Sequence, residues 1–173
     1  MKNLSLIIFL FLLVTCAPIR VNYDYDREVD FSKYKTYNYY SNINSGLSEL
    51  DTERLLNALD EGLQAKGLGL SETPDFYIDI KSNTYQEVQN SSVGVGVGGT
   101  GGNVGGGISV GIPIGQSNLN RVIQFDFVDE NGQGLFWQAL SESSFTPNSA
   151  PEKREAMLKA IVTKVLEGFP PKN

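Results

Sequence analysis

The chain has 173 residues and a formal net charge of −6, which suits one acidic domain after removal of an N-terminal signal. Such a chain lacks the basic surface that nucleic acid requires, so we exclude nucleic acid as a partner. It contains no histidine, which excludes a Ser-His-Asp triad, a Cys-His pair and a histidine-ligated zinc or iron site. Carboxylate, lysine or tyrosine chemistry is left, or a protein that is not an enzyme and holds no cofactor or metal.

Residues 1–15 have the pattern of a secretory signal peptide. Lys2 supplies a positive start, an apolar run follows, and Leu13-Val14-Thr15-Cys16 ends it with the single cysteine of the chain. The run is too short to span a bilayer, which takes about 20 apolar residues. This pattern resembles the precursor of a bacterial lipoprotein, so we predict that Cys16 becomes the acylated first residue. A free thiol in a secreted protein and a cysteine removed with the signal are the alternative interpretations.

The predicted anchor gives a location and a partner. Each buried methylene of an acyl chain contributes about 0.8 kcal/mol, so the two or three chains on Cys16 would hold the protein permanently to membrane lipid. Ala17 follows the cysteine without an acidic run, which favours the outer membrane and its periplasmic face. We expect residues 16–22 to form a tether and residues 23–173 to form a single α+β domain.

Two segments after the tether predict strands. Tyr23 to Asp26 alternates aromatic and acidic residues at period two. Asp24 and Asp26 are candidates for a cation site or a hydrolytic carboxylate pair, although the exposed face of a strand is the favoured interpretation. Residues 31–40 are rich in tyrosine and predict a strand half-packed on a core, with a carbohydrate or peptide groove as the alternative.

Residues 50–66 predict the first helix. Its leucines form one apolar stripe at helical spacing: Leu55, Leu56, Leu59 and Leu63. Ser48 or Asp51 can cap the start, and Gly67 suits the left-handed stop. Gly62 inside the helix costs about 1 kcal/mol relative to alanine, which indicates that a neighbour packs closely there.

The middle of the chain predicts three further strands, at residues 74–86, 119–128 and 135–145. Alternating apolar residues mark the core-facing side of the first two: Phe76, Ile78, Ile80, Ile123, Phe125 and Phe127. Asp75 and Asp79 are weak metal candidates. Asn131-Gly132 predicts the hairpin turn between the last two strands, and Trp137 is expected in the core.

The same turn has the spacing of a calcium loop at Asp129, Asn131 and Gln133. Leu140 stands where such a loop requires a bidentate glutamate, so we predict a turn without calcium.

Residues 91–116 are glycine-rich and contain a formal match to the dinucleotide-binding fingerprint. We reject that match because no helix pattern follows it to receive a pyrophosphate. Valine and isoleucine at period two instead predict a glycine-faced hairpin, and Pro113 suggests that it lies at a sheet edge. A mobile edge hairpin is favoured over a segment that admits a neighbouring backbone or dips into a membrane.

Residues 150–167 predict the last helix. Ser149 and Glu152 form a capping box around Pro151, and Gly168 marks the end before Phe169-Pro170-Pro171. The expected buried stripe consists of Met157, Leu158, Ile161, Val162 and Val165.

Taken in order, these features resemble the bacterial lipoproteins of the domain-of-unknown-function 4136 family. The signs are the lipobox, the tyrosine-rich strand, a strand opening Pro74-Asp75, Leu135-Phe136-Trp137-Gln138, and the closing Phe169-Pro170-Pro171. The resemblance implies an α+β domain with helices against an antiparallel sheet. It implies no activity and no catalytic residues.

The expected fold is therefore α+β, with an antiparallel sheet, two helices on one face and a glycine-rich edge hairpin. The favoured function is a non-catalytic binding or envelope-associated module, with an envelope protein partner at the hairpin. One alternative is a carrier of a small apolar ligand, which predicts an enclosed pocket of roughly 300 Å³ or more between sheet and helices. A carboxylate-based hydrolase is the remote alternative.

Overall fold

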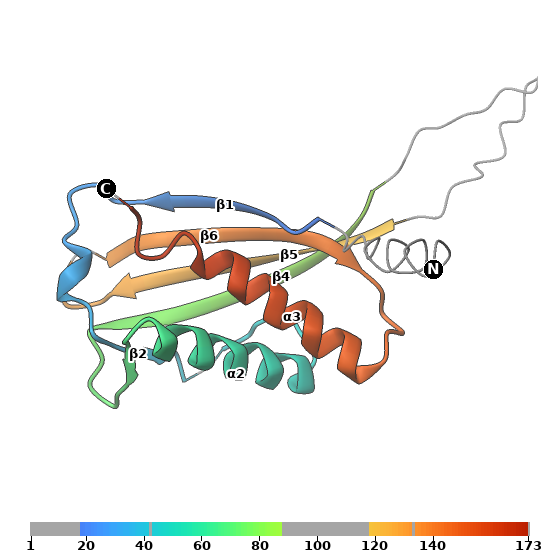
Figure 1. The fold of residues 1–173 in the computed structure, drawn as a ribbon, viewed down its shortest axis with the longest axis horizontal. Coiled ribbons are helices and arrows are strands. Elements are labelled where there is room, and N and C mark those ends of the chain that lie inside the picture. The colour runs from blue at the N-terminus through green and yellow to red at the C-terminus, as the bar shows by residue number, and fades with distance from the viewer. Residues whose placement is uncertain (1–17, 42, 88–117, 133, 173) are drawn as a thin grey trace, which may run out of the picture.

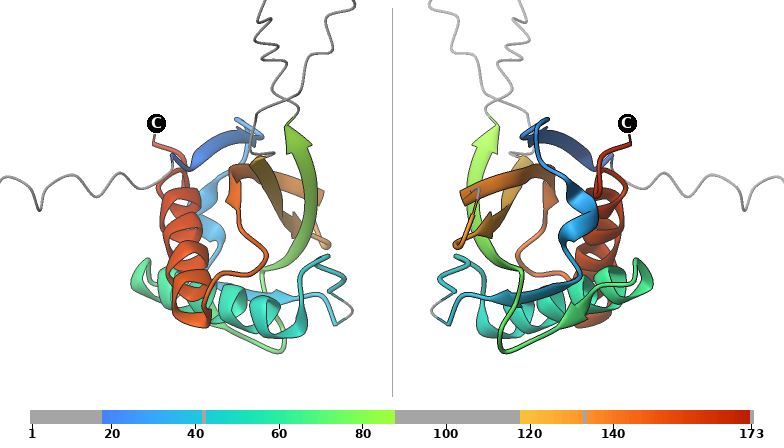
Figure 2. Two further views of the ribbon diagram at one scale, coloured as in Figure 1. Left: turned by 90° about the vertical axis from the view of Figure 1, so that its right-hand side faces the viewer. Right: turned by 90° about the vertical axis from the view of Figure 1, so that its left-hand side faces the viewer.

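The computed structural model describes residues 18–41, 43–87, 118–132 and 134–172. In chain order the elements are β1 (Arg20–Tyr25), the short 3₁₀ helix η1 (Phe31–Lys33), β2 (Thr36–Tyr39), α2 (Glu49–Ala65), β3 (Gly69–Leu70), β4 (Phe76–Glu87), β5 (Asn118–Asp129), β6 (Gly134–Phe145) and α3 (Pro151–Leu166). The strands form one six-stranded sheet in the order β1-β6-β5-β4-β2-β3 (Figure 1). The twisted sheet curves around a core that α2 and α3 close (Figure 2).

The expected α+β class is confirmed, with one correction to the sheet. The pairs β1–β6, β6–β5 and β5–β4 are antiparallel, whereas β2 runs parallel to both β3 and β4. Parallel neighbours need a crossover connection, and α2 lies in the connection from β2 to β4. The sheet is therefore mixed at its β2–β3 end.

The N-terminal strands differ from expectation at both ends. β1 begins at Arg20, so the last part of the expected tether belongs to the sheet. The expected strand at residues 31–40 is shortened to β2, because Phe31–Lys33 forms the 3₁₀ turn. The side chain of Asp30 accepts the Ser32 N–H at 2.9 Å, and this local hydrogen bond competes with a strand conformation.

The core is aromatic and lies between the sheet and the helices. The core-facing residues expected in β4 and β5 are fully buried, and so is Trp137. Phe127 pairs with Trp137 and Val128 pairs with Leu135, so Phe136 is the extra residue of a β-bulge. The bulge lets Phe136 and Trp137 both point into the core although they are adjacent in sequence.

Helix α2 starts and ends where its caps require. The Ser48 side chain accepts the Asp51 N–H at 3.3 Å. At the other end Gly67 adopts φ +86°, and Leu68 N donates to Leu63 O at 3.0 Å, the geometry of a Schellman stop. A Cβ at Gly62 would lie 2.5 Å from Leu166 Cδ1 of α3, which confirms the close contact expected at that glycine.

Helix α3 lacks the predicted capping box. Its N-cap is Ala150, which makes no side-chain cap hydrogen bond, and Ser149 lies one residue before that position. Pro151 explains the shift, because proline fits the first helical position and thereby makes the residue before it the cap. The expected apolar stripe is otherwise present, with Leu158, Ile161, Val162 and Val165 buried and Met157 partly buried.

The C-terminal segment completes the core beyond α3. Phe169 is buried against Trp137 and Phe127, with ring centroids 5.3 and 4.9 Å away. Trp137 Nε1 donates to Gly168 O at 3.2 Å, and Tyr23 Oη of β1 donates to Lys164 O at 2.6 Å. These contacts tie β1 and the chain end to the helix.

Several expectations fall outside the described residues, namely the signal peptide, Cys16 and the hairpin at residues 91–116. The described flanks of that hairpin are the end of β4 at Glu87 and the start of β5 at Asn118, and β4 and β5 are paired neighbours inside the sheet. The sheet edges are β1 and β3. In the described part of the chain, no helix has the length and apolarity needed to cross a membrane.

Candidate functional site

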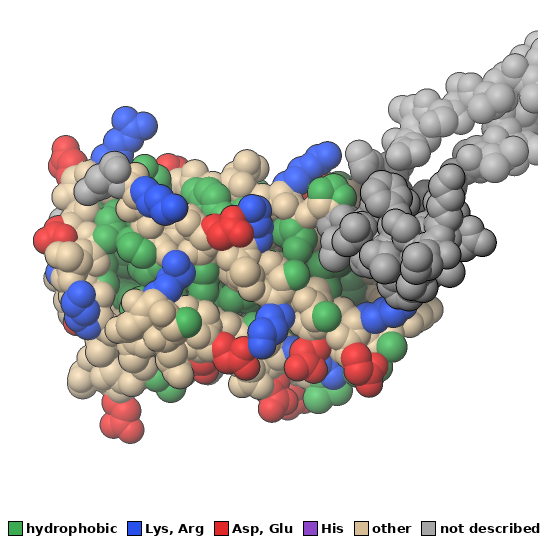
Figure 3. Space-filling model, viewed as in Figure 1, with side chains coloured by type: hydrophobic (Ala, Val, Ile, Leu, Met, Phe, Trp, Pro, Cys, Tyr) green, Lys and Arg blue, Asp and Glu red, His purple; other side chains and the backbone are tan. Residues whose placement is uncertain are grey.

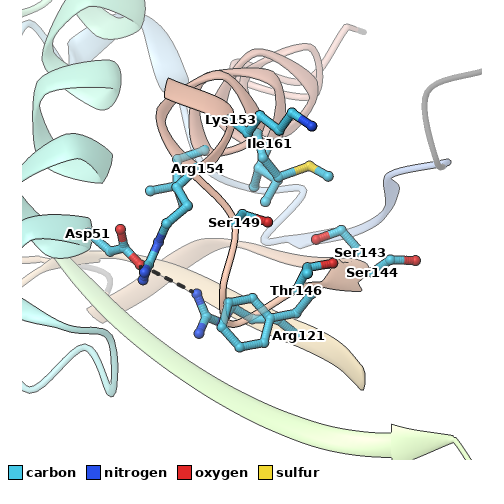
Figure 4. Close-up of a pocket in the computed structure, with 12 residues that line it drawn as sticks. Asp51, Arg121, Ser143, Ser144, Thr146, Ser149, Lys153, Arg154 and Ile161 are labelled. Atoms are coloured by element: carbon cyan, nitrogen blue, oxygen red, sulfur yellow. Dashed lines mark hydrogen bonds and ion pairs between the residues drawn. The ribbon is translucent and has the colours of Figure 1, made fainter. Parts of the chain in front are cut away.

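A pocket of about 200 Å³ lies between the first turns of α3, the start of β5 and the end of β6 (Figure 4). One side is mainly apolar and comes from α3. The other side carries charged groups from α2, β5 and α3. Its lining residues are Asp51, Arg121, Ser143, Ser144, Phe145, Thr146, Ser149, Lys153, Arg154, Met157, Leu158 and Ile161.

A buried carboxylate organises the charged side. Asp51 is 1% exposed and sits in the first turn of α2, where the Ser48 hydroxyl already accepts its backbone N–H. Its carboxylate is therefore free to turn away from the helix end. Oδ1 accepts Arg54 Nη1 at 2.8 Å, Oδ2 accepts Arg154 Nη2 of α3, and Arg121 Nη1 of β5 lies 3.8 Å from Oδ2.

The cluster holds three positive charges against one negative charge. Burial disfavours the ionised form of Asp51, but the hydrogen bonds from Arg154 and Arg54 outweigh it and hold the pKa of this carboxyl below its ordinary value. Burial lowers the pKa of the Arg121 guanidinium, Asp51 opposes that shift, and nearby Arg154 adds to it. The surplus positive charge is therefore concentrated in a partly dehydrated place.

Two arginine atoms have hydrogen-bonding capacity to spare. Among the described residues, the buried Nε atoms of Arg121 and Arg154 have no hydrogen-bond partner. The Arg121 guanidinium carbon lies 3.4 Å from the centroid of the Phe145 ring, and this stacking fixes the plane of the group. Fixed guanidinium planes suit carboxylate and phosphate groups, which accept hydrogen bonds in that geometry.

The chemistry of this side favours binding. Guanidinium groups remain protonated and donate hydrogen bonds without accepting any, so they cannot serve as general bases. Around them stand the hydroxyl side chains of Ser143, Ser144, Thr146 and Ser149.

The two carboxylates proposed from the sequence as a pair are both exposed to solvent. Asp24 and Asp26 are exposed, and each accepts a nearby backbone N–H, from Tyr25 at 3.0 Å and Glu28 at 2.9 Å respectively. The exposed-face interpretation of this pair is thus confirmed.

The metal candidates have structural partners. Asp75 Oδ2 accepts the N–H groups of Lys35 and Thr36 at 2.8 Å each, which joins the start of β2 to the start of β4. Asp79 forms an ion pair with Lys81 at 2.6 Å. The described segments contain no group of three or more ligand-type side chains placed to hold a metal.

The predicted turn at Asp129 is present, and its carboxylate has a structural role. Asp129 is 6% exposed and accepts hydrogen bonds from Tyr34 Oη at 3.1 Å and Lys33 Nζ at 3.2 Å. The third residue of the calcium-loop spacing, Gln133, lies outside the described residues.

The tyrosine-rich segment is part of the core. Tyr34 and Tyr37 are buried, and the hydroxyls of Tyr37 and Tyr39 both donate to Asp60 Oδ1 of α2 at 2.7 Å. Burial, followed by this neighbouring carboxylate, raises the pKa of both phenols. The tyrosines fasten β2 to α2, which supports the packed-strand interpretation over a groove.

The pocket also bears on the apolar-carrier hypothesis. Its volume of about 200 Å³ falls short of the roughly 300 Å³ expected for such a carrier, and aromatic side chains fill the space between helices and sheet. A larger hollow of about 540 Å³ lies at the opposite end, beside η1 and the Phe169 segment. It lies away from the interface between helices and sheet.

The sequence predicted Asp51 as a possible helix cap, and no motif in it marked Arg121 or Arg154. The sequence nevertheless contains a pattern that indicates this cluster. Arg121 follows the period of Ile123 and Phe125 and so occupies a core-facing position of β5, and Arg154 precedes Leu158 by one helical turn. Charged residues at core-facing positions indicate a buried ion cluster.

The fold has counterparts among solved structures. It matches a PDZ domain protein from Parabacteroides distasonis at 16% identity and a TM-score of 0.56, covering 99% of this chain and 41% of that one, so the present chain spans about two fifths of that protein. It matches PelC, a dodecamer from Paraburkholderia phytofirmans, at 9% identity and a TM-score of 0.53, covering 90% and 100% respectively. A DUF4136 family protein from Bacteroides thetaiotaomicron matches at 16% identity and a TM-score of 0.49, covering 88% and 96%.

Sequence comparison gives the family. A search of curated protein sequences returned no match. The profile of the family described as "Domain of unknown function (DUF4136)" matches residues 21–171, from the first strand to the segment after the last helix. This match covers nearly all of the domain built by the six strands and two helices, and the chain therefore belongs to the DUF4136 family.

Proposed function

We propose that the protein is a non-enzymatic binding module of the bacterial envelope, anchored through acylated Cys16 to the outer membrane and facing the periplasm. The observation that carries the proposal is the short distance from the anchor to the sheet. Only four Cα–Cα steps separate Cys16 from the start of β1 at Arg20. Such a segment spans at most about 14 Å, so the domain would lie directly against the membrane.

The short tether also selects the end of the domain that would face the bilayer. Arg20 pairs with Glu142 of β6, and the pocket residues Ser143 to Phe145 follow at once. β4 ends and β5 begins at this same end (Figure 1). The anchor, both flanks of the glycine-rich segment and the pocket would thus share one membrane-proximal end.

The anchor would work through acyl chains and need no charged attraction. Acidic and basic side chains are interspersed over the face that carries the helices, with apolar side chains between them (Figure 3). The net charge of −6 opposes attraction to anionic lipid. Arginine donors in the pocket favour holding a ligand over transforming it.

Two experiments test this proposal. The intact mass of protein extracted from membranes should show acyl chains on Cys16, and Cys16→Ser should move the protein to the soluble fraction. Recovery of unacylated protein, or membrane retention of the serine variant, would refute the anchor.

The orientation can be tested separately. Spin labels at Ser144→Cys and Thr73→Cys place probes at exposed positions, one near the end of β6 and the other just before the start of β4, at opposite ends of the sheet. A lipid-soluble relaxation agent should broaden the label at position 144 more than the one at 73. Equal broadening would contradict the proposed orientation.

A second candidate function is contact with an envelope protein through residues 91–116. Its support is the position of the flanks, because β4 and β5 remain paired up to Glu87 and Asn118, at the end of the domain that we propose faces the membrane. Photo-crosslinking from Val95 in intact cells should capture an envelope protein, with Thr73 as the matched position at the other end. Equal capture from both positions, or none from Val95, would count against this contact.

A further inference from the structure

We propose that the pocket beside α3 binds an anionic amphiphile, a ligand with a carboxylate or phosphate head on a short apolar chain. The head would lie against Arg121 and Arg154, and the chain would lie along Met157 and Ile161. The inference rests on the proposed function only for the source of the ligand, which is the adjoining membrane. The chemistry of the pocket stands on its own residues.

The first argument is charge. Asp51 is shared by three arginines, and both of its oxygens are engaged. The side chain of Arg121 is only 13% exposed, so water compensates little of its charge. A second anion would balance the positive charge that the single Asp51 carboxylate leaves uncompensated in this cluster.

The second argument is hydrogen bonding. Buried polar atoms in folded proteins nearly always have partners, yet the Nε atoms of Arg121 and Arg154 have none in the described part of the chain. Both residues line the pocket, as do the hydroxyl-bearing Ser143 and Ser149. Because each Nε is fully buried, an oxyanion in the pocket would accept from the outer N–H groups of the two guanidiniums and from these hydroxyls. Charge-assisted hydrogen bonds of this kind are about twice as strong as neutral ones.

The third argument is the opposite wall. Met157 and Ile161 lie one turn apart on α3 and line the pocket together with Leu158. Lys153 lies one turn before Met157 at the rim of the pocket, so the apolar part of this wall is formed by Met157, Leu158 and Ile161. Methionine adapts to irregular apolar shapes. The combination of a cationic end with an apolar wall selects an amphiphile over a free inorganic anion.

The size limits the ligand. A volume of about 200 Å³ is below the range of roughly 300–1,000 Å³ typical of sites for drug-sized molecules. The pocket therefore suits a short-chain molecule or the head and first methylenes of a lipid. A lipid would enter directly from the bilayer if this end faces it.

The test uses a reporter that the chain already contains. The sequence has two methionines, and Met157 lines the pocket. The full chain, labelled with ¹³C-methyl methionine, is placed in phosphatidylcholine nanodiscs, or used directly if it proves soluble. The measurement can therefore be made whether or not Cys16 proves to be acylated. The Met157 methyl resonance, assigned with Met157→Leu, is followed while hexyl phosphate, hexanoate, hexanol or inorganic phosphate is added.

We expect saturable shifts with hexyl phosphate and hexanoate, and at least about ten-fold weaker binding of hexanol and inorganic phosphate. Arg121→Gln should weaken the binding of hexyl phosphate by a similar factor. Lys153→Gln removes a charge from an exposed residue of the pocket rim, where folding is not at risk, and should weaken it about two- to five-fold. Lys81→Gln makes the same charge change on the exposed side chain of β4 and should have no effect.

Four outcomes would overturn the proposal. These are no shift with any probe, equal affinity for hexanol and the anions, equal affinity for inorganic and hexyl phosphate, and unchanged binding in both the Arg121 and the Lys153 variants. Replacing part of the phosphatidylcholine with phosphatidylglycerol distinguishes the source. A Met157 shift without added probe supports a bilayer lipid, whereas a shift only with soluble probe supports a free amphiphile of the same chemistry.

Discussion

Replacing Asp51 with asparagine should destabilise the protein more than any other conservative change of a carboxylate. The residue is 1% exposed, and it is the carboxylate that three arginines share. Breaking a buried ion pair typically costs 3–5 kcal/mol. The side chains of Arg54 and Arg154 retain 22% and 26% exposure, so water compensates part of the loss. We therefore expect a loss of about 2–4 kcal/mol in the free energy of unfolding.

Urea unfolding at pH 7, followed by the fluorescence of Trp137, measures this loss directly. In thermal unfolding the same change should lower Tm by roughly 5–15 °C for a domain of this size. Asp24→Asn is the matched control, because Asp24 is exposed and bonds only to the neighbouring backbone N–H. It should change stability by no more than about 0.5 kcal/mol.

A second measurement tests the cause of the Asp51 effect. Added phosphate should stabilise Asp51→Asn more than the unmodified protein, because the variant leaves three guanidinium groups without a carboxylate. If Asp51→Asn matched its control, or if phosphate had equal effects on both proteins, the buried carboxylate would not hold this end of the fold together.

Three further predictions concern the fold. Gly46→Ala should lower the free energy of unfolding by more than about 1 kcal/mol, because Gly46 has φ +69° and a Cβ there would lie 2.5 Å from Ser82 O. Urea unfolding measures this loss, and Gly69→Ala, where a Cβ meets open space, is the control. Asp75 has a folded pKa below its ordinary 3.8, because two backbone N–H groups and a hydroxyl outweigh the effect of its burial. The stability that the ionised Asp75 carboxylate contributes should be complete above its unfolded pKa and lost as pH falls through its folded pKa. The unfolding curves of Asp75→Asn and the unmodified protein should therefore differ at pH 6 and converge at acidic pH. Phe169→Ala should cost about 3–5 kcal/mol, measured by thermal unfolding, and a loss below 1 kcal/mol would contradict the buried position of the C-terminal segment.

Local patterns predicted most of the secondary structure. The alternation in β4 and β5, the leucine stripe of α2, the glycine stop at Gly67 and the turn before β6 all follow from interactions between residues close in sequence. The prediction failed where two local signals competed. Asp30 turned an expected strand into a 3₁₀ turn, and Pro151 displaced the cap from Ser149.

The candidate site was harder to predict because its parts come from three distant elements. Asp51, Arg121 and Arg154 belong to α2, β5 and α3, and no motif of adjacent residues joins them. From the sequence, each of these residues could be identified only as a charged side chain at a position that faces the core. Their meeting depends on the order of the strands and on how the two helices close the core.

The amino-acid sequence by itself determined the α+β class, the limits of the two helices, the apolar faces and the exclusion of histidine chemistry, since these depend on composition and on neighbours along the chain. Only the tertiary structure decided that β2 runs parallel to β4, that a bulge buries Phe136 beside Trp137, and that the arginine pocket lies at the same end as the start of β1. These features arise from contacts between residues far apart in sequence. Such contacts form through the packing of whole elements, which a local pattern does not encode.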